Sequence, residues 1–301
     1  MQSIIEVEHL RKVYGQVVAV DDVSLAVAEG EIFGMLGPNG AGKTTTVECL
    51  QGLRTADSGS VRVIGLDPKT QARTLRPLIG SQLQESALPD RIKVWEALDL
   101  FASVSNSSAD WRVLLQQWGL EQKRGASFGA LSGGQRQRLF IALALVNNPR
   151  VVFLDEMTTG LDPAARHVAW ELIKAIRDKG TTVVLVTHFM DEADELCDRV
   201  AIVDRGKVIA SDSPAALVAK HASEVSVTFT ASRDCSWLSE VPCVGSVVRQ
   251  GTRMEVKGSG AVVAHVASSL LNHGIEPTDL RVKQPSLEDV FLKLTGKTAE
   301  E

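Results

Sequence analysis

The sequence lacks the cysteine pattern by which several protein classes are recognised. Its four cysteines, Cys49, Cys197, Cys235 and Cys243, are scattered, and no two of them form a CxxC pair. This spacing argues against a disulfide framework and against a cysteine-based zinc site. Cys235 and Cys243 could meet across a hairpin, but two ordinary thiols in a reducing compartment are the simpler expectation.

A basic excess and a long apolar run are also absent. The net charge of −5 and the isoelectric point near 5.8 argue against a nucleic-acid partner, because general nucleic-acid binders carry a basic stripe. Residues 1–12 have an acidic, alternating pattern, unlike the basic start and apolar core of a signal peptide. The longest apolar stretch, 139–146, is far shorter than the roughly 18 residues that a membrane span needs. We therefore expect a cytoplasmic protein that could act at a membrane only through another, spanning chain.

The composition and the order of patterns predict an α/β fold. The chain has 301 residues, of which 44% are apolar and 23% charged, as in soluble globular proteins, and this length favours two domains. Short strands are expected within 4–36, with Ile5, Val7 and His9 on one face. Strands then alternate with helices, which predicts a mostly parallel sheet. The other elements expected here are helices at 43–50, 164–179 and 190–197, a helical segment at 94–146, and strands at 59–64, 151–154, 182–187 and 200–203.

The pattern of expected strands and helices changes after about residue 220. The elements expected there are strands at 224–230 and 252–257, a helix at 261–271, and a last helix that Ser286 and Asp289 would cap and Gly296 would end. We therefore predict an α/β domain over 1–220, with a helical subdomain at about 88–148, and a small α+β domain over 221–301.

A glycine-rich loop follows the third expected strand and precedes a helix. Residues 37–44 read GPNGAGKT and match the phosphate-binding pattern G-x-x-x-x-G-K-[ST]. Glycines let successive backbone N–H groups turn inward around a phosphate, and the following helix presents its positive end. Lys43 would neutralise β and γ oxygens of a nucleotide, and the Thr44 hydroxyl would ligate Mg²⁺. A purely structural turn is the alternative, which the position between a strand and a helix disfavours.

Two acidic residues end a strand that is otherwise apolar. Residues 151–156 read VVFLDE. A buried strand has no use for carboxylates at its end unless they face a cation or a water molecule. Asp155 would orient Mg²⁺, and Glu156 would polarise the attacking water as a general base. Taken alone, the same two residues could instead cap a helix.

A third motif begins a helix between these two segments. Residues 131–135 read LSGGQ and precede the amphipathic segment 136–146. Ser132 can cap this helix while the amides at its start face an anion. The motif is therefore either a capped helix start or a second phosphate-binding surface. One chain would struggle to apply both surfaces to one nucleotide, whereas two chains arranged head to tail could do so.

Taken in order, these motifs resemble those of the nucleotide-binding subunit of an ABC transporter. GPNGAGKT, LSGGQRQR and VVFLDE are followed by GLD at 160–162 and by Thr187 and His188 after a strand, and the resemblance covers roughly residues 4–220. It implies a RecA-like P-loop NTPase with antiparallel β and helical subdomains. It further implies binding and hydrolysis of ATP with Mg²⁺ in a homodimer. A separate polytopic permease would hold the chain at the inner face of the membrane.

The resemblance also assigns roles to single residues. Glu156 and His188 would be the catalytic base and the switch histidine at the γ-phosphate. Gln84 would be the glutamine that senses Mg²⁺ and the γ-phosphate, with Gln82 as the competing candidate. The implied metal ligands are Thr44, Gln84 and Asp155. The implied nucleotide contacts are Tyr14, which would stack on adenine, and Gly37, Pro38, Asn39, Gly40, Ala41, Gly42, Lys43, Thr44, Thr45, Ser132, Gly133, Gly134 and Asp162.

Two further segments bear on the function. The family usually has proline after the catalytic glutamate, where this chain has Met157, so only the stiffness of the turn is in question. The tail 285–296 reads PSLEDVFLKLTG and resembles the daunorubicin-resistance-like branch of bacterial ABC exporters, which implies export. It could also be an ordinary terminal helix that buries its apolar residues.

The resemblance leaves two questions open. A soluble ABC ATPase that acts on a non-membrane machine is the rival function, but such proteins commonly carry two cassettes or a long coiled-coil insert, and this chain has neither. The permease should dock beside Gln84. The candidates for that groove are Leu88, Arg91, Val94, Trp95 and Leu98, although tryptophan at such a position is more often core.

Overall fold

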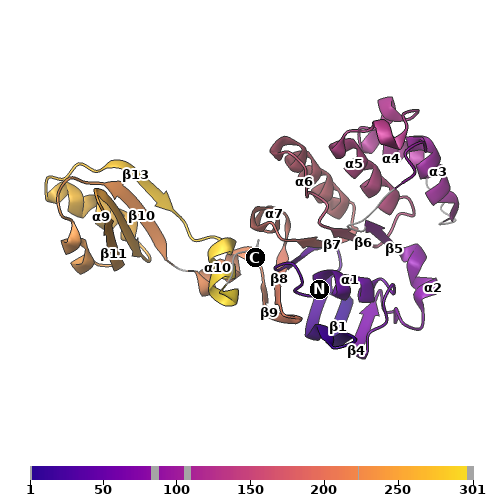
Figure 1. The fold of residues 1–301 in the computed structure, drawn as a ribbon, viewed down its shortest axis with the longest axis horizontal. Coiled ribbons are helices and arrows are strands. Elements are labelled where there is room, and N and C mark those ends of the chain that lie inside the picture. Colours follow the sequence, from indigo (N-terminus) through magenta and orange to yellow (C-terminus); the bar gives the residue numbers. More distant parts are fainter. Residues whose placement is uncertain (1, 83–87, 105–109, 223, 297–301) are drawn as a thin grey trace. The chain divides into compact units, whose positions relative to one another are not determined.

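The computed structural model describes residues 2–82, 88–104, 110–222 and 224–296, which form two compact units (Figure 1). The first unit ends at Pro214, and the second comprises residues 215–296. The division lies at the first turn of helix α8, a few residues before the boundary that the sequence suggested.

A nine-stranded mixed sheet is the frame of the first unit. Its strand order is β4-β1-β2-β9-β8-β3-β7-β6-β5. Strands β5, β6, β7, β3 and β8 pair in parallel, while β4, β1 and β2 form an antiparallel ribbon. Strand β9 joins the two parts, because it pairs with both β2 and β8. The bounds are β1 Ser3–Tyr14, β2 Val17–Ala28, β3 Ile32–Leu36, β4 Ser58–Val63, β5 Ile79–Gln82, β6 Val151–Asp155, β7 Thr182–Thr187, β8 Arg199–Asp204 and β9 Lys207–Asp212.

Helices surround the parallel part of this sheet. Helices α3, α4 and α5 are grouped together near β5, whereas α6 and α7 lie together beside β7 (Figure 1). The predicted helical segment therefore consists of several short helices. The bounds are α1 Lys43–Leu50, α2 Ala72–Leu75, α3 Val94–Val104, α4 Trp111–Gln117, α5 Gly133–Ala144, α6 Pro163–Asp178 and α7 Met190–Leu196, with 3₁₀ turns η1 Arg76–Leu78, η2 Glu121–Lys123 and η3 Phe128–Ala130.

The parallel strands bring the chemical motifs together. Every residue of β3, β6 and β7 is buried, as expected for strands covered on both faces. Their carboxyl ends are adjacent, because Leu36 pairs with Thr187 and Asp155 pairs with Val186. The glycine-rich loop, the acidic pair and His188 therefore start from neighbouring points on one edge of the sheet.

A bulge changes the expected pattern of β1. The expectation that His9 shares a face with Ile5 and Val7 is wrong. The pairing with β2 shifts register between Val7 and Leu10, His9 has a φ of 50° and is exposed, and Leu10 is fully buried. An extra residue in one strand of a pair reverses the alternation beyond it, which explains the change.

The second unit is a small α+β domain. Its antiparallel sheet has the order β11-β12-β10-β13, and helix α9 covers the buried side chains of β10 and β12. The predicted cap of the last helix is confirmed, since Ser286 and Asp289 form a capping box and Gly296 is left-handed with a φ of 68°. The bounds are α8 Pro214–His221, β10 Val225–Thr230, η4 Ser236–Glu240, β11 Val244–Gln250, β12 Arg253–Gly258, α9 Val262–Asn272, β13 Thr278–Lys283 and α10 Leu287–Thr295.

Two sequence-level expectations concern covalent and membrane features. All four cysteines are free thiols, and Cys235 is buried while Cys243 is exposed. Within the described ranges, no helix combines the length and the apolar character needed to cross a bilayer.

Candidate functional site

The glycine-rich loop is packed too closely for side chains at two of its glycines. A Cβ at Gly37 would lie 2.3 Å from the carbonyl oxygen of Val203, and one at Gly42 would lie 2.3 Å from that of Ala19. Gly42 also has a φ of 98° and is the N-cap of α1. The loop therefore runs close to its neighbours and leads directly into a helix N-terminus, where backbone N–H groups favour an anion. Around it, Pro38 and Ala41 are buried, Asn39 and Gly40 are exposed, and Thr45 is half-buried.

Lys43 lies at the start of α1 with its ammonium group turned toward the loop. Its Nζ donates hydrogen bonds to the carbonyl oxygens of Gly37, at 2.7 Å, and Pro38, at 3.0 Å. Burial lowers the pKa of Lys43, while Glu156 and Asp155 act in the opposite direction. A buried ammonium whose hydrogen bonds go to neutral carbonyls is well suited to exchange them for phosphate oxygens.

Asp155 and Thr44 form a pair that fits a magnesium ion. The Thr44 hydroxyl donates to Oδ2 of Asp155 at 3.1 Å, whereas Oδ1 is buried without a hydrogen bond. Burial raises the pKa of Asp155 to about 6, against the lowering effect of Thr44. The described residues contain no cluster of three or more His, Cys, Asp or Glu side chains suited to a metal. Mg²⁺ commonly takes one or two protein oxygens and completes its shell with phosphates and water, so this pair suits it.

Replacing Asp155 by asparagine is expected to stabilise the nucleotide-free protein while removing its turnover. Because the pKa of Asp155 lies at about 6 in the folded state and near 3.8 otherwise, the folded state binds the proton more tightly. The protonated Asp155 therefore stabilises the folded state below about pH 4. This contribution to the free energy of unfolding, about 3 kcal/mol, is lost as the pH rises to 7. In urea unfolding from pH 4 to 8, Asp155→Asn should therefore gain stability relative to the natural protein as the pH rises, by about 3 kcal/mol. A variant with the same pH dependence as the natural protein would contradict the expectation.

Glu156 and His188 face each other across the ends of β6 and β7. Nδ1 of His188 lies 3.2 Å from Oε1 of Glu156. Glu156 has a φ of 49°, a left-handed conformation that costs free energy in a non-glycine residue, and its N–H donates to the carbonyl of Val186. Strain of this kind is typical of functional positions held by their surroundings. Lys43 interacts electrostatically with both Glu156 and Asp155. The carboxylate of Glu156 and the imidazole of His188 therefore lie in the same site as the buried ammonium group.

The two remaining motifs each begin a helix. Ser132 caps α5 and forms a capping box with Gln135, so the predicted cap is confirmed. Ser132 and Gly133 are exposed, and Gly134 is half-buried beside Ala165 of α6. Asp162 caps α6 by accepting a hydrogen bond from the N–H of Ala165 at 2.9 Å. The start of α5, at Ser132 and Gly133, therefore lies at the surface of the chain.

Several predicted residues lie outside this group or outside the described ranges. Gln84 falls among residues 83–87, which the structure does not describe, whereas its competitor Gln82 is buried at the end of β5. Tyr14 is 39% exposed at the end of β1, and its ring is flanked by the cations of Lys12 and Arg54.

The docking set is partly wrong. Val94 and Leu98 are fully buried, because these positions of α3 face the interior of the helical group rather than a surface. Arg91 is exposed, and Leu88 and Trp95 are half-buried.

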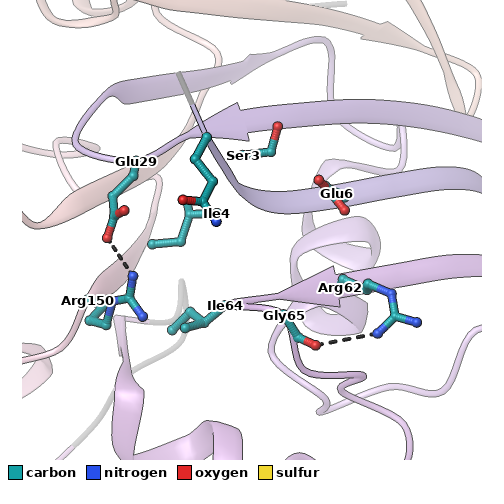
Figure 2. A pocket seen from close by; sticks show the side chains of 9 residues that line it. Ser3, Ile4, Glu6, Glu29, Arg62, Ile64, Gly65 and Arg150 are labelled. Carbon is teal, nitrogen blue, oxygen red and sulfur yellow. Dashed lines mark hydrogen bonds and ion pairs between the residues drawn. The ribbon is translucent and has the colours of Figure 1, made fainter.

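A pocket of about 310 Å³ lies at the opposite end of the parallel strands (Figure 2). Its lining includes Glu29 and Arg150, which precede β3 and β6, and these two side chains form an ion pair. Sites in parallel α/β sheets lie at the carboxyl ends of the strands. The functional site is therefore expected at the carboxyl ends of β3, β6 and β7 rather than in this pocket.

Comparison with known proteins agrees with the geometry. The ABC transporter family model matches residues 20–159. The Nod factor export ATP-binding protein I of Paraburkholderia xenovorans is 37% identical, with 100% of this chain and 99% of that protein covered. The daunorubicin resistance ATP-binding protein DrrA2 of Streptomyces coeruleorubidus is 36% identical, with 98% and 96% covered. The chain belongs to the ATP-binding subunits of ABC transporters.

Solved structures share this fold. An ATP-binding subunit of an ABC transporter is similar with a TM-score of 0.66 and 27% identity, covering 72% of this chain and 93% of its own. A bacterial ABC transporter cassette solved as a dimer has a TM-score of 0.62 and 28% identity, covering 69% and 98%. This ATP-binding subunit is therefore an ATPase with the P-loop cassette fold, and the fold predicted from its motifs is confirmed.

Proposed function

We propose that this subunit binds ATP with Mg²⁺ in a head-to-tail homodimer and that hydrolysis powers export through a separate membrane permease. The convergence of Lys43, Asp155, Glu156 and His188 on adjacent strand ends carries the proposal. The exposed start of α5 supports the dimer, because Ser132 could then complete the site of a second copy. The dimeric cassette among its structural relatives supports the same arrangement.

The residues of the site divide the work between binding and proton transfer. Lys43 and the loop amides would hold the β and γ phosphates, and Tyr14 would stack on the adenine. Thr44, Asp155 and Gln84 would hold Mg²⁺, which neutralises the charge of the phosphates. Glu156 would accept a proton from the attacking water, and His188 would orient that carboxylate and stabilise charge on the γ-phosphate.

Export and the permease are supported by the relatives. One relative is named for Nod factor export and another for daunorubicin resistance, and both are aligned over nearly the whole chain. The likeness continues through the second unit and the tail, which supports membership of an exporter branch. The chain would then work at the inner face of the membrane, held there by the permease.

Affinity capture of the tagged subunit from gently solubilised membranes tests the proposal. We expect a polytopic protein to co-purify at about equal stoichiometry, and we expect Arg91→Glu to reduce its recovery because Arg91 is exposed on the proposed docking side. Arg73→Glu, at another exposed arginine, is the matched control. Recovery of soluble partners alone would refute the transport proposal and favour an ATPase that acts on a non-membrane machine.

A further inference from the structure

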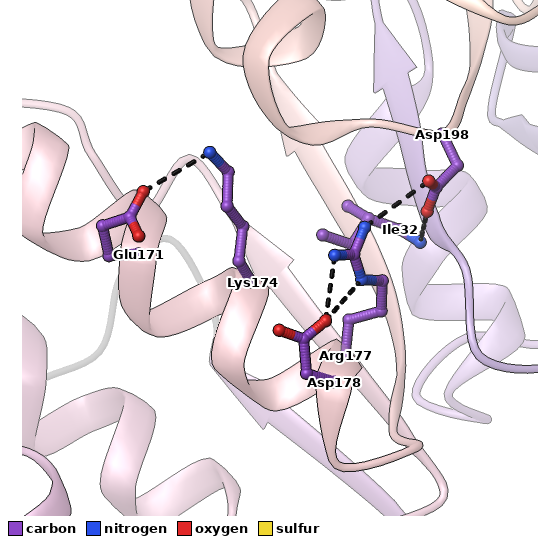
Figure 3. Close-up of polar contacts among 6 residues, drawn as sticks. All are labelled: Ile32, Glu171, Lys174, Arg177, Asp178 and Asp198. Atoms are coloured by element: carbon purple, nitrogen blue, oxygen red, sulfur yellow. Dashed lines mark hydrogen bonds and ion pairs between the residues drawn. The ribbon is translucent and has the colours of Figure 1, made fainter.

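Helices α6 and α7 are joined by three polar contacts in a row. Lys174 of α6 pairs with Glu195 of α7 at 2.6 Å, and Arg166 pairs with Asp191 at 3.3 Å. Between these two exposed pairs, Nε1 of Trp170 donates to Oε1 of Glu192 at 3.2 Å, and both residues are buried. Figure 3 shows Lys174 joined to Glu171, its exposed neighbour on α6. The middle contact therefore differs from the outer two, since it lies within the interior.

Glu192 is the most deeply buried carboxylate of this interface. Its residue has no exposed surface, and Oε2 has no well-aligned hydrogen bond. Burial raises the pKa of Glu192, while the hydroxyls of Thr187 and Thr158 and the indole of Trp170 act to lower it. An incompletely paired carboxyl group in the interior costs free energy that an apolar side chain would not. Packing of α6 on α7 therefore accounts for Oε1, which accepts from the indole of Trp170, but not for Oε2.

The neighbours of this carboxyl group connect it to the hydrolysis site. Thr158 is two residues beyond Glu156, and its Oγ1 is also buried without a well-aligned hydrogen bond. Thr187 is the last residue of β7 and directly precedes His188, and its hydroxyl accepts a hydrogen bond from the N–H of Phe189. The hydroxyls of Thr158 and Thr187 both interact with the Glu192 carboxyl group. One carboxyl group thus faces the segment that follows Glu156 and the segment that carries His188.

The backbone at this point needs support. Glu156 has a left-handed φ of 49°, and Met157 stands where proline would have stiffened the turn. Met157 and Thr158 are buried, so the turn is held by side-chain packing rather than by a rigid residue. A polar group between Thr158 and Thr187 would keep the two segments in register.

We propose that Glu192 is a positioning residue that holds the turn after Glu156 against the end of β7 and thereby maintains the contact between Glu156 and His188. This inference rests on the proposed roles of Glu156 and His188. Glu192 itself touches neither nucleotide nor water in this role. It acts through Thr158 on one side and Thr187 on the other.

Two substitutions of Glu192 test the role through ATP turnover. Glu192→Leu keeps the volume and removes both oxygens, so kcat should fall about tenfold or more while KM for ATP changes less than about twofold. Glu192→Gln keeps an acceptor for Trp170 and polar atoms for the two threonines, so it should restore kcat to within about threefold of the natural value. The contrast between leucine and glutamine, with KM unchanged, separates positioning from general packing.

Three further variants serve as controls for this test. Lys174→Met breaks the neighbouring exposed contact between the same helices and should leave kcat unchanged. Thr158→Val keeps the branched shape and removes the hydroxyl through which Glu192 acts. It replaces Glu192→Leu as the deciding variant if the latter does not fold, and its kcat should fall with KM unchanged. Natural kcat in the deciding variant, or an equal loss in Lys174→Met, would overturn the proposal. Glu156→Gln assayed in parallel tests the proposed base separately, because turnover retained there refutes the base whatever Glu192→Leu does.

Discussion

Glu156→Gln is expected to reduce ATP hydrolysis by about a hundred- to ten-thousandfold while ATP binding is retained. The Glu156 side chain is only 10% exposed, and its Oε1 lies 3.2 Å from Nδ1 of His188. Burial and this contact hold the carboxylate in one orientation. Glutamine keeps the shape and the hydrogen-bonding capacity but cannot accept a proton from water. Phosphate release measures the turnover, and fluorescence titration with a nucleotide analogue measures the binding. Because hydrolysis reopens the dimer in the proposed cycle, size-exclusion chromatography with MgATP should show the variant as a stable dimer.

A glutamate outside the site provides the matched control. Glu171 lies on α6 with 75% of its side chain exposed, and its contact is with Lys174. Glu171→Gln should therefore hydrolyse ATP at the natural rate. The assignment of Glu156 as the base would be refuted if Glu156→Gln retained more than about a tenth of the natural turnover.

Lys43→Ala is expected to weaken nucleotide binding by about a hundredfold or more, since truncating a buried charged partner typically costs 2–5 kcal/mol. Lys43 is 4% exposed, and its ammonium already bonds the carbonyls of the loop that would hold the phosphates. Titration with ATP and with ADP measures the effect, which should be larger for ATP. Lys207→Ala is the control, because Lys207 is 56% exposed and pairs with Asp21 at 3.0 Å. Equal affinity of Lys43→Ala and the natural protein would refute the role of Lys43.

The same variant distinguishes a composite site from a site within one chain. Lys43→Ala and Ser132→Arg should each be inactive as homodimers, because each site lacks one of its two surfaces. In a mixed dimer, one site carries both defects and the other carries none. An equal mixture should therefore recover about a quarter of the natural turnover, if the chains exchange freely and the sites act independently. No recovery beyond the sum of the two variants would contradict the head-to-tail arrangement.

The sequence was most informative where a motif has a fixed spacing and a fixed place between elements. The loop before α1, the acids at the end of β6 and His188 after β7 were all recognisable, because phosphate and metal chemistry restricts both residue types and their order. The cap of α10 was recognisable for a similar reason, since Ser286 and Asp289 satisfy each other at a three-residue spacing. In such places a local pattern determines a local structure.

The sequence was least informative where long-range packing decides. Helix α7 reads MDEADEL, so Glu192 looks like one more acid on a solvated face, and only the placement of α6 shows that it is buried. Val94 and Leu98 looked like surface anchors because an apolar helical face can meet either a core or a partner. Strands β11 and β13 were missed, since their exposed, mixed residues carry little alternation. Strand β9 was missed because no strand was expected between 200–203 and residue 220.

Strand β9 has a consequence for the order in which the subunit is completed during synthesis. Among the strands of the described residues, the ribbon β4-β1-β2 is paired to the parallel strands only through β9, which pairs at Lys207 with Asp22 and runs antiparallel to β8. A chain leaves the ribosome N-terminus first, at about 5–20 residues per second. The ribbon is finished early, but it has no neighbour on its β2 side until residues 207–212 have emerged. A nascent chain that already contains every motif through His188 is therefore still two separate pieces of sheet.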